Sequence, residues 1–145
     1  MRTIALSFLL LFSGGTGSAA PADTPYTRMA KLATYISGGD TVGALEAFDK
    51  SLTNYGRISE DLAALATQSE VLCSIEVVTD KEADDAKADV HHLDLDWYMT
   101  LTSRADPGLT ESRRVRVAVT IARFNAKWRI TALTPDSILA PITIK

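Results

Sequence analysis

The stretch of sequence that decides the fold runs from Ala88 to Pro135 and reads ADVHHLDLDWYMTLTSRADPGLTESRRVRVAVTIARFNAKWRITALTP. Apolar and polar residues alternate in three segments of it, 90–102, 113–124 and 127–134. Alternation with a period of two is typical of β-strands that have one covered face and one wetter face. We therefore expect three consecutive antiparallel strands, and the apolar pattern of 70–78 predicts a fourth strand before them.

Side-chain parity assigns each residue of these strands to one face of the sheet. The covered, concave face is predicted to hold only apolar side chains: Leu93, Leu95, Trp97, Met99, Leu101, Val115, Val117, Val119, Ile121, Trp128, Ile130 and Ala132. The other face is predicted to hold a polar set that includes Asp94, Asp96, Tyr98, Thr100, Arg116, Thr120 and Thr131. His91 and His92 interrupt the alternation, since Val90 and Leu93 cannot both face inward without an extra residue, so we expect a β-bulge there.

The register of the strands follows from the turns and from matching apolar residues. A two-residue turn at Asn125 and Ala126 places Phe124 opposite Lys127. The same turn places Ile121 opposite Ile130 and Val119 opposite Ala132. For the longer hairpin, matching apolar side chains predicts the pairs Leu101 with Val115, Trp97 with Val119 and Leu95 with Ile121.

The amino terminus has the order of a secretory signal peptide: Arg2, an apolar run from Ile4 to Phe12, and small residues up to Ala20. The run is shorter than the ~20 residues of a membrane span. We expect residues 1–22 to be removed and residues 23–145 to form one exported domain, periplasmic or secreted. A permanent amino-terminal anchor is the alternative.

Composition narrows the classes of partner. Without Arg2, 14 basic residues oppose 18 acidic ones, so the mature chain has no electrostatic reason to bind nucleic acid or an anionic membrane. The lone Cys73 excludes an internal disulfide. It lies on the same strand face as Val71 and Ile75, and we interpret it as a small buried hydrophobe.

Three helices are predicted before the sheet. Thr24 caps a helix that starts at Pro25 and ends at Gly38–Gly39. Asp40 caps a second helix, whose apolar stripe is Val42, Leu45, Phe48 and Leu52. Ser59 is expected to cap a third helix that ends near Gln68.

This order of elements resembles the nuclear transport factor 2-like superfamily, which includes SnoaL-like proteins and ketosteroid isomerase-type enzymes. The segments that carry the resemblance are Gly38 to Phe48 and the closing strand KWRITAL at 127–133. The likeness covers about residues 24–135. It implies an α+β fold, in which a cone-shaped, curled antiparallel sheet of about four strands has three N-terminal helices packed on its concave face. It also implies frequent dimerisation through the outer sheet face, but no single activity.

Enzymes of that superfamily place carboxylate, Tyr or His groups inside the cone, where general acid–base chemistry needs them. The predicted concave face has no ionisable group, so no catalytic residue is carried over, and neither a cofactor nor a metal is predicted. His92, Asp94 and Asp96 share one strand face and could bind an ion such as Zn²⁺. Residues two apart on a strand diverge, however, and we interpret them as a solvated or subunit-facing polar row.

The residues predicted to contact a ligand in the cone are Tyr26, Met29, Tyr35, Phe48, Trp97, Met99, Val117 and Trp128. The sequence thus predicts an exported, non-catalytic binding or scaffold module with an apolar cavity or a filled core. Its expected partners are an apolar small molecule and a second copy of the chain, bound through the polar sheet face. The alternative is an isomerase, dehydratase or hydrolase acting on a small apolar molecule in the cone. An open cone with a buried carboxylate or imidazole would favour the enzyme, and a filled cone the scaffold.

Overall fold

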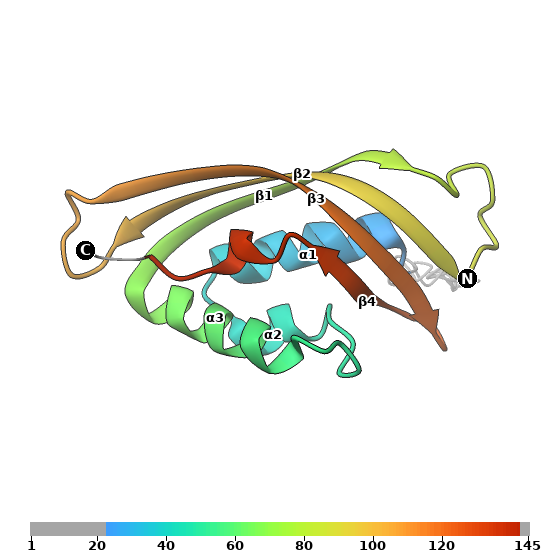
Figure 1. Ribbon diagram of the computed structural model, residues 1–145, viewed down its shortest axis with the longest axis horizontal. Coiled ribbons are helices and arrows are strands. Elements are labelled where there is room, and N and C mark those ends of the chain that lie inside the picture. Colours follow the sequence, from blue (N-terminus) through green and yellow to red (C-terminus); the bar gives the residue numbers. More distant parts are fainter. Residues whose placement is uncertain (1–22, 143–145) are drawn as a thin grey trace, which may run out of the picture.

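The computed structural model describes residues 23–142, in which three helices lie beneath one curved four-stranded sheet (Figure 1). In chain order the elements are α1 (Pro25–Ser37), α2 (Thr41–Leu45), α3 (Tyr55–Gln68), β1 (Ser69–Asp80), β2 (Val90–Ser103), β3 (Thr110–Phe124), β4 (Lys127–Thr134) and the 3-10 helix η1 (Ser137–Leu139). The strands are antiparallel and neighbour one another in sequence order. The predicted fold class, a curled sheet with three N-terminal helices on its concave face, is confirmed. The predicted signal peptide, residues 1–22, lies outside the described residues.

Helix α1 begins and ends as predicted. The Thr24 hydroxyl accepts a hydrogen bond from the Thr27 N–H (3.1 Å), and the Thr27 hydroxyl accepts one from the Thr24 N–H (2.8 Å), which completes a capping box. At the other end Gly39 has a φ of 68°, which glycine adopts without steric cost. The N–H groups of Gly39 and Asp40 bond back to carbonyls of the last turn, and this Schellman motif turns the chain directly into α2.

Helix α2 ends at Leu45, before the predicted apolar stripe is complete. Val42 is 76% exposed, and Phe48 lies outside the helix and is buried. Phe48 forms a parallel bridge with Ile130, whose backbone exchanges hydrogen bonds of 2.7 and 2.9 Å with residues 47–49. The segment after α2 therefore covers the outer edge of β4, because an uncovered edge strand leaves its backbone groups without partners.

Helix α3 begins at Tyr55, earlier than the predicted cap at Ser59. Gly56 lies in its first turn and does not interrupt it. The helix ends at Gln68 as expected, and it buries Ile58 and Leu65 against the rest of the core.

The faces of β2 and β3 are as predicted, but their register differs. Trp97 lies opposite Val115 instead of Val119, and Leu95 opposite Val117. The cause is the length of the connection: β3 already begins at Thr110, so the polar residues 110–112 continue the strand instead of extending the loop. The shift of four residues is even, so no side chain changes face.

The β3–β4 hairpin turns at Asn125, which has a φ of 56°. The predicted pairs Phe124 with Lys127 and Ile121 with Ile130 are confirmed. Val119 faces Leu133, not Ala132, because Thr131 is an extra residue at a bulge. The placement of Ala132 on the concave face is therefore wrong: Ala132 is exposed, and Leu133 is buried in its place.

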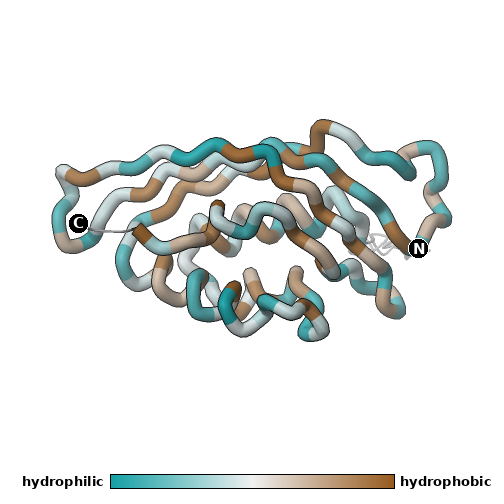
Figure 2. Tube along the Cα trace, in the orientation of Figure 1, coloured by the Kyte–Doolittle hydropathy of each residue, from teal (hydrophilic) through white to brown (hydrophobic). Residues whose placement is uncertain are grey.

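The concave side of the sheet is closely packed. Along β2 and β3 the chain alternates between apolar and polar residues (Figure 2). Leu95, Trp97, Met99 and Leu101 have an exposed fraction of 0%, and Leu32 of α1 packs against the same core with none. A void large enough for water would leave its lining residues some accessible surface, so no such void touches these side chains. The described helices include none that is both long and apolar enough to span a membrane.

Candidate functional site

The bulge expected at His91–His92 lies instead in β1. Val78 is an extra residue there, and pairing with β2 resumes at Thr79. One inserted residue reverses the facing of every residue after it. Thr79 therefore points to the outer face, whereas Asp80 lies opposite Leu93 on the concave face. The bulge brings a carboxylate to the side of the sheet that was predicted to be wholly apolar.

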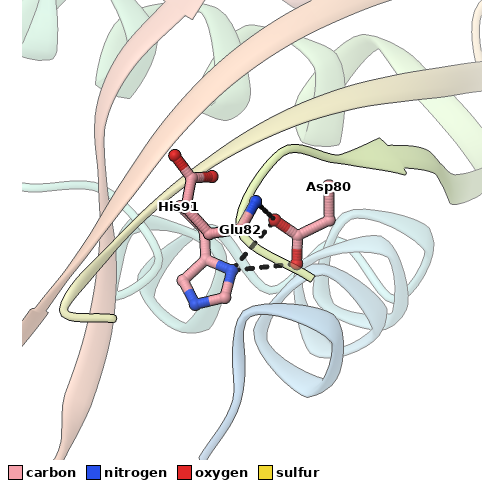
Figure 3. Close-up of side chains that lie close together, drawn as sticks. All are labelled: Asp80, Glu82 and His91. Carbon is pink, nitrogen blue, oxygen red and sulfur yellow. Dashed lines mark hydrogen bonds and ion pairs between the residues drawn. The ribbon is translucent and has the colours of Figure 1, made fainter. Parts of the chain in front are cut away.

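His91 also lies on the concave face. It has the same parity as Leu93 in β2 and is 5% exposed. Its Nδ1 atom lies 2.8 and 3.0 Å from the two carboxylate oxygens of Asp80 (Figure 3). Its ring meets Trp128 edge-on at a centroid distance of 5.2 Å. The prediction that this face carries no ionisable group is wrong, because Val90 faces outward, 41% exposed, and β2 needs no bulge.

Three donors converge on the Asp80 carboxylate, whose side chain is 3% exposed. They are His91, the backbone N–H of Glu82 at 3.0 Å and the hydroxyl of Tyr26 from α1 at 2.5 Å. Burial alone would raise the pKa of the Asp80 carboxyl, but the hydrogen bonds from Tyr26, His91 and Glu82 outweigh it and hold that pKa below its usual value. The same bond to Asp80 raises the pKa of the Tyr26 hydroxyl. We call Tyr26, Asp80 and His91 the sheet-end cluster; it ties α1 to the end of β1 and the start of β2.

Asp80, Glu82 and His91 place possible metal-ligand atoms within 4.8 Å of one another. The Nδ1 atom of His91 and both carboxylate oxygens of Asp80 are already engaged, because they bond to each other. The Glu82 carboxylate accepts hydrogen bonds from His92, at 2.6 Å from its ring and 2.7 Å from its N–H. Bonding to His92 also lowers the pKa of the Glu82 carboxyl. We therefore assign no metal to this group.

The polar row that the sequence suggested as an ion site is divided among different partners. His92 pairs with Glu82, while Asp94 accepts a hydrogen bond from the Thr79 hydroxyl at 3.1 Å. Asp96 binds the guanidinium of Arg114 through bonds of 2.7 and 3.1 Å, and this hydrogen bonding lowers the pKa of the Asp96 carboxyl. These side chains lie on the outer face of the sheet and do not converge on one point.

An open groove of about 470 Å³ lies beside β4, between the start of α1 and the connection from α2 to α3. Its apolar lining consists of Val42, Leu45, Phe48 and Tyr55. Its charged lining consists of Arg28, Lys50, Lys127, Arg129 and Glu46. Pockets of 300–1,000 Å³ that combine an apolar lining with a few polar groups are typical of small-molecule sites.

Arg28 is the one buried cation of this groove. Its side chain is 9% exposed, and its Nη2 atom donates to Asp23 at 2.9 Å. The same carboxylate oxygen of Asp23 accepts the Trp128 N–H at 2.9 Å, so α1 and β4 hold the guanidinium in place together. The Nε–H of Arg28 is buried and has no hydrogen-bond acceptor within residues 23–142.

Six of the predicted ligand-contacting residues are in the packed core: Met29, Phe48, Trp97, Met99, Val117 and Trp128. Of these, Phe48 lines the groove. Tyr35 is half-buried and packs against Gly43, where an added Cβ would lie 2.6 Å from its ring. Tyr26 is 47% exposed and belongs to the sheet-end cluster. Ligand binding by these residues stays a prediction.

Sequence reasoning missed Asp80, His91 and Arg28. A signal for His91 was present, since its parity matches that of Leu93. The inward position of Asp80 depends on a bulge at Val78, and the regular alternation of apolar residues in β1 does not reveal that bulge. Arg28 reads as an ordinary surface residue of an amphipathic helix, whereas in the fold it is buried and paired with Asp23.

No protein-family model and no curated protein matches the chain. Solved structures do match in shape. A conserved protein from Planctomyces limnophilus superposes with a TM-score of 0.66 at 7% identity, over 74% of this chain and 88% of that one. Aln2 from a Streptomyces species gives a TM-score of 0.58 at 19% identity, over 74% and 83% of the two chains.

A nuclear transport factor 2-like superfamily protein from Salmonella enterica gives a TM-score of 0.56 at 14% identity, over 82% of this chain and 89% of that one. At such identities the likeness establishes the fold and leaves activity open. The fold is the nuclear transport factor 2-like fold that the resemblance implied.

Proposed function

We propose that this chain, which has the nuclear transport factor 2-like fold, is an exported, non-catalytic module that binds its partners on its outer surface. Export rests on the signal-peptide pattern of residues 1–22. The observation that carries the rest of the proposal is the filled cone: Trp97, Met99 and Leu101 have no exposed surface. A small molecule therefore has no room beside them, and binding falls to the groove or to the outer face of the sheet.

The outer sheet face is the proposed surface for a second copy of this chain. It carries the predicted residues Asp94, Asp96, Tyr98, Thr100, Arg116, Thr120 and Thr131. Tyr98 is 42% exposed, Leu72 of β1 is 71% exposed, and Arg116 has no ion-pair partner within the described part of the chain. A face that holds both carboxylates and guanidiniums can complement itself about a two-fold axis.

Methyl-labelled methionine tests the filled cone. Met29 and Met99 are 1% and 0% exposed and lie in the core. On titration with decanol, a neutral apolar probe, we expect the NMR signals of both methyl groups to stay in place. Nuclear Overhauser contacts between decanol and the Met99 methyl would place a ligand inside the cone and overturn the proposal.

A catalytic function is the second candidate, and the sheet-end cluster is the observation that favours it. Asp80 accepts the Nδ1–H of His91, which would leave Nε2 as the basic nitrogen, and Nε2 has no hydrogen-bond partner among residues 23–142. A general base must also reach its substrate. His91 is 5% exposed and does not line the groove, so we assign it a structural role.

The two histidines of the chain provide a direct test of this choice. The His92 side chain is 49% exposed and that of His91 is 7% exposed. Diethyl pyrocarbonate should therefore modify His92 much faster than His91, as peptide mass spectrometry would show. Equal rates would mean that reagents reach His91 Nε2, and a catalytic function would then be the better interpretation of the sheet-end cluster.

A further inference from the structure

The groove beside β4 is electrostatically biased. Lys50, Lys127 and Arg129 line it, and none of the three has an ion-pair partner in the described part of the chain. Glu46 is the one carboxylate among the lining residues. The whole chain is acidic, with a formal net charge of −3, so this excess of positive charge is local. It favours an anionic ligand.

Arg28 supplies an independent observation. Its guanidinium is buried at the groove, and its Nε–H lacks an acceptor among the described residues. Buried donors in folded proteins are nearly always paired, because an unpaired one loses its hydrogen bonds to water without replacement. Asp23 accepts from only one corner of this guanidinium. Arg28 also lines the groove, so an anion bound there would meet a guanidinium that the protein pairs at one corner only.

The rest of the lining is apolar. Val42 is 76% exposed at the groove, and Leu45 and Tyr55 are half-buried beside it. An exposed aliphatic side chain next to half-buried apolar residues offers a surface that a short hydrocarbon chain can cover. The groove therefore places apolar contacts next to a positively charged region.

We propose that the groove binds a small molecule that joins one carboxylate to a short apolar chain. The carboxylate binds beside the Arg28 guanidinium and faces Arg129 and Lys127, while the apolar chain lies on Val42 and Leu45. This inference rests on the proposed function in one respect, namely that ligands bind outside the cone. A buried guanidinium next to an apolar lining matches a carboxylate on a hydrocarbon chain better than a polyphosphate, which carries no apolar part.

Decanoate, kept well below micelle-forming concentrations, is the test probe, and decanol and acetate are its controls. Amide and methyl chemical shifts of the mature protein report where each probe binds and how tightly. We expect decanoate to shift the signals of Val42, Leu45 and Arg129. Decanol and acetate should each bind about tenfold more weakly or worse, since each lacks one half of the recognised structure. Added salt should weaken decanoate binding.

Two variants and a matched control locate the anion. Arg129→Gln should weaken decanoate binding about two- to fivefold, the effect of one partly exposed charge. Arg28→Lys keeps a cation for Asp23 but removes the planar guanidinium at the groove, and we expect a loss of about fivefold or more. Arg104→Gln removes an exposed arginine that follows β2 and does not line the groove, and it should leave the affinity unchanged. Should Arg28→Lys fail to fold, Arg129→Gln and its control still decide.

Several results would overturn the inference. Equal affinities for decanol and decanoate would show that the groove does not recognise the anion. Equal affinities for acetate and decanoate would show that it does not recognise the apolar chain. Equal effects of Arg129→Gln and Arg104→Gln, or no decanoate binding at millimolar concentration, would rule out the site. Decanoate-induced shifts at Trp97 and Met99 would instead show that the cone opens, which contradicts the proposed function itself.

Discussion

Replacing Asp80 by Asn tests whether the sheet-end cluster holds α1 to the sheet. The Asp80 side chain is 3% exposed and accepts hydrogen bonds from Tyr26, His91 and the Glu82 N–H. Asn has nearly the same volume but keeps only one acceptor oxygen, so at least one donor loses its partner and faces an NH₂ group. We expect the free energy of unfolding to fall by about 1.5–3 kcal/mol, the usual loss for a buried hydrogen bond to a charged group.

The assay is urea unfolding followed by tryptophan fluorescence, since Trp128 contacts the His91 ring. Asp89→Asn is the matched control: the Asp89 side chain is 67% exposed and pairs with Arg123 at the same end of β2 and β3. That change should cost less than about 1 kcal/mol. Equal urea midpoints for Asp80→Asn and Asp89→Asn would refute the reasoning, because the buried network would then contribute nothing.

The pH dependence of the Asp80 effect has a defined sign. The pKa of Asp80 is lower in the folded chain than in the unfolded chain, so the carboxylate stabilises the fold above the ordinary Asp pKa of about 3.9. This contribution is lost as the pH falls through the lower, folded value. The difference in unfolding free energy between wild type and Asp80→Asn should therefore persist at pH 7 and shrink below about pH 4. A difference that grew on acidification would contradict the assignment.

Three further predictions concern packing, reactivity and association. Gly43→Ala should cost about 1–3 kcal/mol in urea unfolding because the new Cβ would lie 2.6 Å from the Tyr35 ring, whereas Gly56→Ala, with no neighbour within 4 Å, should be neutral or stabilising. Burial raises the pKa of the Cys73 thiol to about 12, so a maleimide should label it at pH 8 only after unfolding. Arg116→Glu should weaken a dimer in sedimentation more than it weakens the fold, with a smaller difference in high salt. A monomeric wild type at micromolar concentration would reject that dimer.

The alternation of apolar and polar residues predicted the sheet well, because burial of one sheet face imposes this alternation on every strand. Trp97 and Met99 were assigned to the correct face even though Trp97 was paired with the wrong residue of β3, since the register error was even. Polar composition misled the loop assignment at 110–112. Those residues lie at the far end of the hairpin, where a strand can continue without an apolar face.

The sheet-end cluster could not be predicted from the alternation of apolar and polar residues, because it depends on one bulge. The extra residue at Val78 leaves the apolar alternation of β1 up to Val77 unchanged, so the sequence gives no sign of it. It nevertheless turns Asp80 inward toward His91. Sequence reasoning meets a similar limit at Phe48. Its spacing from Leu45 fits a continued helix, and nothing in the sequence distinguishes that from the bridge to Ile130. Phe48 bridges to Ile130 because the edge strand β4 needs backbone hydrogen-bond partners, and that need arises only in the folded sheet.

Xenon binding to the protein tests the central claim, that the cone is filled, most directly. Xenon enters dry apolar cavities, and an engineered cavity in an apolar core binds it. We predict no xenon site between α1 and the sheet in a pressurised crystal of the wild type. We predict one in Met99→Ala, which removes a fully buried side chain. Xenon in contact with Trp97 and Met99 of the wild type would show an open cone and contradict this account.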